Sequence, residues 1–120
     1  MNNRTRKLLF DVLESGRSIR QWCEHRSFAE YEAERQFRRA VEREFEIIGE
    51  ALNRLLRDDP ATAARIGQLS RIVGFRNRIV HGYDTVDDAT VWGIASRDLP
   101  QLLAEVETLL GDTNASDERS

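Results

Sequence analysis

Residues 37–55 of the chain read FRRAVEREFEIIGEALNRL, and their large apolar side chains recur at intervals of three and four residues. This spacing places them on one face of an α-helix, because a helix turns by about 100° per residue. The apolar stripe consists of Phe37, Val41, Phe45, Ile48, Leu52 and Leu55. Arginine and glutamate side chains occupy the opposite face, which we expect to be solvated and crossed by ion pairs. The stretch predicts a long amphipathic helix that covers a hydrophobic core.

Similar patterns on both sides of this stretch predict further helices. Before it, the apolar positions between Lys7 and Cys23 recur at helical spacing, and Ser27 and Glu30 have the spacing of a capping box that starts a short helix. After it, Asp59-Pro60 has the pattern of a helix N-cap followed by proline at the first helical position, where the missing amide hydrogen costs nothing. The connection between these two helices is therefore expected to be short.

The segment from Leu69 to Val80 also favours a helix. Its β-branched pairs Ile72-Val73 and Ile79-Val80 could instead form strands, but their spacing of seven residues fits two helical turns better than alternation. We expect Gly67 to end the small helix that precedes this segment, and Gly82 to end the segment itself.

A last helix is predicted by apolar positions from Val91 to Leu110, after a possible N-terminal cap formed by Thr85 and Asp88. Pro100 should kink or interrupt this helix, because it removes one backbone hydrogen bond. Residues 112–120 contain no large apolar side chain and are expected to form a disordered polar tail after a domain spanning residues 1–111. The predicted fold is an all-α, up-and-down bundle of four long helices plus short helical segments.

The composition favours a soluble, single-domain protein. The chain has 120 residues, 40% of them hydrophobic, and no apolar run approaches the roughly 18 residues of a membrane span. The N-terminus lacks the features of a secretory signal, so we expect a cytoplasmic protein without membrane contact. Cys23 is the only cysteine, which excludes an internal disulfide. The net charge of −3 argues against a protein that coats nucleic acid, and any such contact should be local.

Reactive side chains are concentrated in residues 76–84, RNRIVHGYD. Arginine can grip a phosphate through two parallel hydrogen bonds, and histidine can move protons near neutral pH. Arg76 falls in the middle of the apolar stripe of its predicted helix, where an unpaired charge would be costly. It therefore requires an acidic partner, for which Glu46 and Glu50 are the candidates, or a ligand phosphate, or a wet interface with a second subunit.

The other groups of the segment do not converge automatically. Asn77 and His81 are four residues apart and stack on successive turns, whereas Arg76 and His81 point about 140° apart on a regular helix. Either the helix relaxes near its end, or a second subunit forms the other wall of a shared cleft. His81 could also serve only to bond the carbonyls of a helix C-terminus, and Tyr83 could be a half-buried aromatic. On the residues alone, these structural roles are slightly favoured.

The spacing Arg76-x4-His81-x-Tyr83 resembles the signature of HepT-type proteins in the HEPN superfamily. Residues 41–52 (VEREFEIIGEAL) resemble the central helix of that family, and residues 73–77 (VGFRN) resemble its approach to the motif. Val91-Trp92 and Leu99-Pro100 match the pattern of its last helix. The resemblance covers nearly the whole chain except the two termini.

This resemblance implies a helical protein that forms a homodimer, with the motifs of both subunits lining a cleft at the interface. Many HEPN proteins are metal-independent ribonucleases, and HepT proteins are toxins of toxin–antitoxin pairs. The implied partner is a separate chain, a nucleotidyltransferase antitoxin of the MNT (MntA) type. In this family the antitoxin transfers AMP from ATP onto the motif tyrosine, which here is Tyr83.

The expected substrate is RNA, and no cofactor and no metal are expected. Arg76 and His81 are the predicted catalytic residues: Arg76 would stabilise charge on the phosphate and His81 would exchange protons with the reacting oxygens. Asn77 and Arg78 are predicted to support phosphate binding or orientation, and AMP on Tyr83 would block the site. The alternative hypothesis is a non-catalytic helical module that uses the same cleft to bind a nucleotide or the nucleotidyltransferase.

Overall fold

A computed structural model of the protein describes the backbone of residues 1–81 and 86–119 and the side chains of residues 1–81 and 86–111. All regular structure in these ranges is helical, which confirms the all-α prediction. The elements are α1 (Asn3–Cys23), α2 (Phe28–Ala33), α3 (Arg35–Asp58), α4 (Pro60–Ala63), α5 (Leu69–His81), α6 (Asp88–Gly93), the π-helical segment η1 (Ile94–Asp98) and α7 (Leu99–Arg119). None of the helices in these ranges combines the length and apolar character that a membrane span requires.

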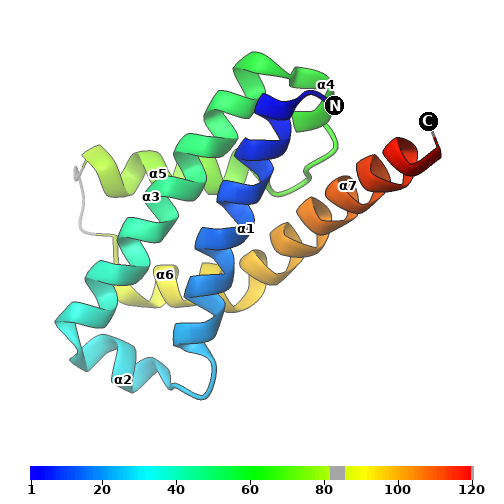
Figure 1. Ribbon diagram of the computed structural model, residues 1–120. Helices are drawn as coiled ribbons and strands as arrows, with labels where there is room; N and C mark the ends of the chain where they lie inside the picture. The colour runs from blue at the N-terminus through cyan, green and yellow to red at the C-terminus, as the bar shows by residue number, and fades with distance from the viewer. Residues whose placement is uncertain (82–85, 120) are drawn as a thin grey trace.

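Helices α1 and α3 form the centre of the molecule. They run side by side in opposite directions, and α5 packs against α3 while α7 packs against α1 (Figure 1). The short helices α2 and α4 lie at opposite ends of α3. The four long helices of the predicted bundle are therefore α1, α3, α5 and α7.

The core is built by the apolar stripe that the central stretch predicted. Phe37 is 8% exposed, and the other five members of the stripe, Val41, Phe45, Ile48, Leu52 and Leu55, are 1% exposed or less. Phe45 meets Phe75 of α5 edge to face, with ring centroids 5.1 Å apart. Each fully buried side chain of this size stabilises the fold by about 1.5–3 kcal/mol. The contact between these two rings joins α5 to the centre of the bundle.

Helix starts follow the predicted capping patterns at two positions. Ser27 and Glu30 form a complete capping box at the start of α2. Asp59 caps α4, where its carboxylate accepts from the backbone N of Thr62 at 3.2 Å and from the Thr62 hydroxyl at 2.7 Å. The same carboxylate also accepts from the hydroxyl of Thr5 on α1, at 3.1 Å. Asp59 therefore ties the beginning of α1 to the corner between α3 and α4.

Three predicted helix boundaries differ from the structure. Helix α1 begins at Asn3 rather than near Lys7, because the side chain of Asn2 accepts from the amide of Thr5 at 2.8 Å and caps the helix earlier. Helix α4 ends at Ala63, so Gly67 does not end it and lies in the turn before α5.

The cap of α6 is also different. Asp87 is the N-cap, and its side chain accepts from the amide of Thr90 at 2.7 Å. The predicted cap formed by Thr85 and Asp88 was therefore wrong, since Asp87 makes the capping hydrogen bond and Asp88 is already the first residue of the helix. Thr85 lies outside the described residues, as does Gly82.

The predicted interruption of the last helix at Pro100 is a π-helical segment just before the proline. The π-helical segment η1 separates α6 from α7, and Pro100 is the second residue of α7. A wider π-helical turn relieves the loss of the proline amide and the crowding by its ring. The backbone of α7 then continues to Arg119, through most of the segment for which a disordered tail is predicted. No side chain of residues 112–120 is described, and the domain boundary at residue 111 stays a prediction.

Candidate functional site

Helix α5 carries residues 76–81 of the reactive segment, and contacts hold both its buried face and the turn before its start. Leu69, Ile72 and Phe75 are buried toward the core. In the turn before the helix, the carboxylate of Glu105 on α7 accepts from the backbone N of Gly67 at 2.7 Å and of Gln68 at 3.4 Å. A carboxylate at this position satisfies free backbone donors and complements the helix dipole.

Arg76 of α5 lies directly against Gly49 of α3. A Cβ placed on Gly49 would lie 2.2 Å from the Cβ and 2.4 Å from the Cγ of Arg76, far inside van der Waals contact. Only a residue without a side chain permits this approach. Gly74, which lies inside α5, has nothing within 4 Å of such a Cβ. A close packing contact is therefore present at Gly49 and not at Gly74.

The guanidinium of Arg76 is held by hydrogen bonds from two sides. Its Nη2 donates to Oε2 of Glu50 at 3.2 Å, and its Nη1 donates to Oδ1 of Asn77 at 3.1 Å. The Arg76 side chain is 22% exposed, and its Nε is buried without a partner among the described residues. Of the two candidate acids, Glu50 is the partner, while Glu46 pairs with Arg43 at 3.2 Å. The cost of placing this charge on an apolar stripe is thus offset by an acidic neighbour.

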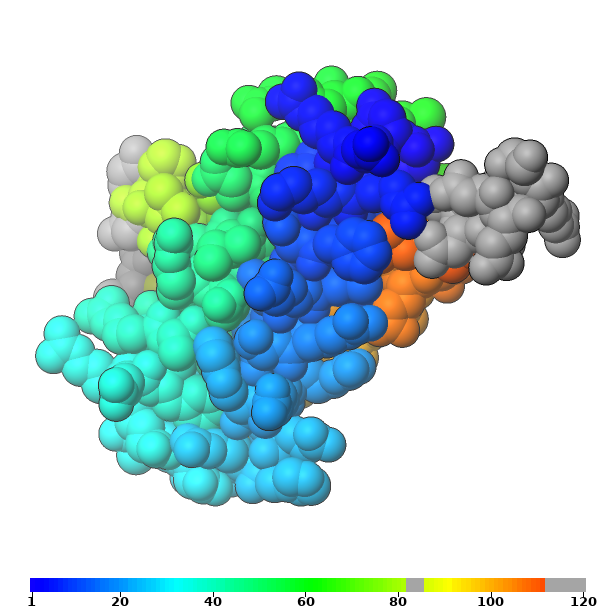
Figure 2. Space-filling model, in the orientation of Figure 1, coloured from blue at the N-terminus to red at the C-terminus, as the bar shows by residue number. Residues whose placement is uncertain are grey.

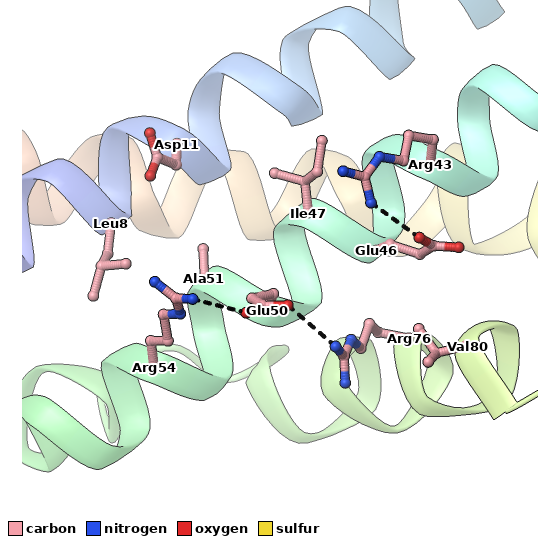
Figure 3. A pocket seen from close by; sticks show the side chains of 10 residues that line it. All are labelled: Leu8, Asp11, Arg43, Glu46, Ile47, Glu50, Ala51, Arg54, Arg76 and Val80. Atoms are coloured by element: carbon pink, nitrogen blue, oxygen red, sulfur yellow. Dashed lines mark hydrogen bonds and ion pairs between the residues drawn. The ribbon is translucent and has the colours of Figure 1, made fainter.

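Arg76 opens into a groove of about 410 Å³ between α1, α3 and α5, shown in Figure 3. Its charged lining residues are Asp11, Arg43, Glu46, Glu50, Arg54 and Arg76. Arg54 donates to Oε1 of Glu50 at 3.0 Å, so this carboxylate joins two arginines. Arg54 is not among the residues predicted from the sequence, although its position four residues after Glu50 is the spacing of a helical ion pair. The groove can present guanidinium groups to an anion while keeping them oriented.

Asn77, Arg78 and His81 lie on another side of α5 from Arg76. Asn77, Arg78 and His81 are exposed, whereas Arg76 is turned toward α3. The α-helix is regular as far as His81, its last residue, so it does not relax before that point. The structure therefore brings Arg76 together with Asn77, while the five-residue separation directs Arg76 and His81 to different sides of the helix. Tyr83 lies outside the described residues.

Trp92 and Cys23 belong to the packed structure and not to the candidate site. Trp92 packs in a cluster with Phe28, Tyr31 and Phe37, and its ring centroid is 5.5 Å from that of Tyr31. Burial raises the pKa of the Cys23 thiol to about 11, which keeps it protonated and unreactive near neutral pH. Among the described side chains, no three His, Cys, Asp or Glu residues are grouped so that they could hold a metal ion.

Comparisons with known proteins converge on one family. The family model described as "Ribonuclease HepT-like" matches residues 12–109. The chain is 30% identical over 112 residues to "Putative RNase MJ1216" of Methanocaldococcus jannaschii, covering 93% of this chain and 92% of the relative. It is 32% identical over 99 residues to "Putative RNase MJ1380" of the same organism, covering 82% of this chain and 90% of the relative. No solved structure matches the chain.

Proposed function

Because the chain belongs to the HepT-like ribonuclease family, we propose that it is an RNA-cleaving toxin whose active site is built on α5. One observation carries this proposal. The arginine of the motif, Arg76, is only 22% exposed yet lines an open groove, and its guanidinium is held there by Glu50 and Asn77. A preoriented cation at the edge of a groove is suited to stabilising a reacting phosphate.

The proposed reaction is cleavage by the RNA itself, without a metal ion. The 2′-hydroxyl loses its proton and attacks the adjacent phosphorus, while the bond from phosphorus to the 5′-oxygen breaks and that oxygen gains a proton. The products are a 2′,3′-cyclic phosphate and a 5′-hydroxyl end. Arg76 stabilises the charge that develops on the phosphate, and His81 transfers one of the two protons. Asn77 and Arg78 assist in holding the phosphate.

A homodimer supplies what one subunit lacks in this proposal. Arg76 and His81 of one subunit face different sides of a regular helix, so one subunit alone does not bring both side chains to one site. Helix α5 packs mainly against α3, which leaves Asn77, Arg78 and His81 exposed on its outer side. A second copy that covers this side of α5 and extends over the adjoining groove would bring its own His81 to Arg76.

The cleavage proposal is tested by incubating RNA with the purified protein in the presence of EDTA. We expect cleavage by the wild type, and a loss of at least about a hundredfold in both Arg76→Ala and His81→Ala, in line with the usual contribution of a general acid–base group. His25→Ala is the matched control, because His25 is the other histidine and its side chain is 90% exposed. Cleavage that survives in both site variants would overturn the assigned residues.

The alternative function is a non-catalytic module that binds a nucleotide or the nucleotidyltransferase in the same cleft. It is favoured by the fact that Arg43, Arg54 and Arg76 in the groove are all already paired with glutamates. Absence of cleavage by protein that mass spectrometry shows to be unmodified would support this alternative over the ribonuclease.

We place regulation at Tyr83, two residues after His81 in the chain. In this proposal the partner is an MNT-type nucleotidyltransferase antitoxin that transfers AMP from ATP onto the Tyr83 hydroxyl and releases pyrophosphate. The added phosphate carries a negative charge to the place where the RNA phosphate should bind. Incubation with such a partner and ATP should add the mass of AMP to the wild type and not to Tyr83→Phe. A Tyr83→Phe protein that gains this mass would show that another residue is modified.

A further inference from the structure

The carboxylate of Glu50 lies between two guanidinium groups. Its Oε1 accepts from Nη2 of Arg54 at 3.0 Å, and its Oε2 accepts from Nη2 of Arg76 at 3.2 Å (Figure 3). Arg54 comes from the next turn of α3, whereas Arg76 comes from α5. The three side chains together carry one net positive charge, because two cations share one anion.

This arrangement leaves little freedom to the Arg76 side chain. Gly49, the residue before Glu50, allows the Cβ and Cγ of Arg76 to lie directly on the backbone of α3. An arginine has five N–H donors. One of them is used by Glu50 and one by Asn77, and the Nε–H is buried. The donors that remain on the terminal nitrogens are therefore held in a defined direction.

We propose that Glu50 is a positioning residue for Arg76 and that Arg54 preserves the positive charge of the pair. The inference rests on the proposed function, in which Arg76 stabilises the reacting phosphate. A single glutamate beside Arg76 would orient the guanidinium but would also cancel its charge. Arg54 on the second carboxylate oxygen removes this conflict, so that Arg76 is both oriented and able to attract an anion.

Charge and orientation predict opposite effects on RNA binding and on catalysis when Glu50 is changed. Glu50→Gln removes a negative charge from the groove, so attraction of the RNA phosphates should stay the same or increase. The guanidinium of Arg76 loses its fixed direction, however, and misplacement of a catalytic group by about 1 Å can cost a hundredfold in rate. A merely structural role for Glu50 would not separate these two quantities.

The experiment measures steady-state cleavage of a short RNA in EDTA by full-length wild type, Glu50→Gln, Glu50→Asp and Arg54→Gln. The Glu50 side chain is 50% exposed, so its replacement leaves the core intact, which circular dichroism verifies. We expect Glu50→Gln to lower kcat about tenfold to a hundredfold with an unchanged or lower KM. Glu50→Asp, which keeps the charge, should retain more of kcat than Glu50→Gln.

Arg54→Gln should act mainly on binding. It leaves the Glu50 charge opposed by Arg76 alone, so KM should rise severalfold while kcat falls less than in Glu50→Gln. Arg57→Gln is the matched control, because Arg57 is exposed on the same helix and does not line the groove.

Two results would overturn the proposal in distinguishable ways. If the wild type cleaves RNA and Glu50→Gln cleaves it with the same kcat, so that any loss of kcat/KM comes from a rise in KM alone, the positioning role is wrong while the ribonuclease proposal stands. If unmodified wild type does not cleave RNA, both proposals fall together.

Discussion

Two helical glycines, Gly49 and Gly74, differ in whether the packing of helices requires them. Gly49 of α3 lies under Arg76, whereas Gly74 of α5 has an open surrounding. Helical glycines usually cost the fold about 0.5–1 kcal/mol relative to alanine, because glycine loses more backbone freedom on folding. At Gly49 this cost is accepted in exchange for the close approach of α5.

Substitution of these glycines should therefore have opposite effects on stability. Gly49→Ala places a methyl group against the Cβ of Arg76, which cannot move without its backbone, and should lower the free energy of unfolding by about 1–3 kcal/mol. Gly74→Ala should raise it by about 0.5–1 kcal/mol through helix propensity. Urea unfolding followed by circular dichroism measures both. Equal effects of the two substitutions would contradict the packing that the structure assigns to Gly49.

Helix caps stabilise individual elements, and the cap at Asp59 also links two helices. It begins α4, and it also accepts from Thr5 of α1. Hydrogen bonds from the side chain and the backbone of Thr62 are the main cause of its lowered pKa. Because the folded-state pKa is depressed, the charged form stabilises the fold above the ordinary aspartate pKa, and this contribution is lost as the pH falls through the folded-state value.

Asp59→Ala should reduce the free energy of unfolding by about 0.5–2 kcal/mol near pH 7, which is the usual range for loss of an N-cap. Asp59→Asn keeps a capping oxygen but cannot titrate, so it separates the cap from the charge. The stability difference between the wild type and Asp59→Asn should be largest near neutral pH and should shrink toward pH 3. Unfolding curves at several pH values measure this difference, and a constant difference would contradict the assigned pKa shift.

The outer faces of α1 and α3 dominate the view in Figure 2, and residues of α5 appear at one edge of it. At the scale of the whole molecule, α5 contributes a buried side to the bundle and an exposed side that carries Asn77, Arg78 and His81. In the proposed homodimer, this exposed side faces the second copy, and the two subunits share the reacting groups.

Mixing two inactive variants tests this sharing directly. If each site takes Arg76 from one subunit and His81 from the other, a mixed dimer of Arg76→Ala and His81→Ala retains one intact site. After random exchange of subunits, up to about a quarter of the wild-type cleavage should return, since half of the dimers are mixed and each has one of its two sites intact. Either variant refolded alone is the control. Absence of recovery in a mixture confirmed to contain mixed dimers would place each site within one subunit.

Much of the fold and part of the site could be predicted from the order of residues alone. The apolar stripe of α3, the capping box at Ser27 and the cap at Asp59 are set by neighbours three or four residues apart, and all three predictions are confirmed. The need of Arg76 for a group that compensates its charge also follows from its position on an apolar stripe. An unpaired buried charge lowers the stability of the fold however the helices pack, so this requirement can be predicted without the tertiary structure.

Only the tertiary structure decided which groups meet across helices. Glu46 and Glu50 lie one turn apart on α3, and both were candidates, but the close approach over Gly49 brings Arg76 to Glu50. The pairing of Glu50 with Arg54 follows the four-residue spacing within α3, but Arg76 joins this pair only because α5 approaches α3 there. Spacing along the chain determines where a side chain stands on its own helix, but the distance and rotation between two helices result from many weak packing contacts acting together.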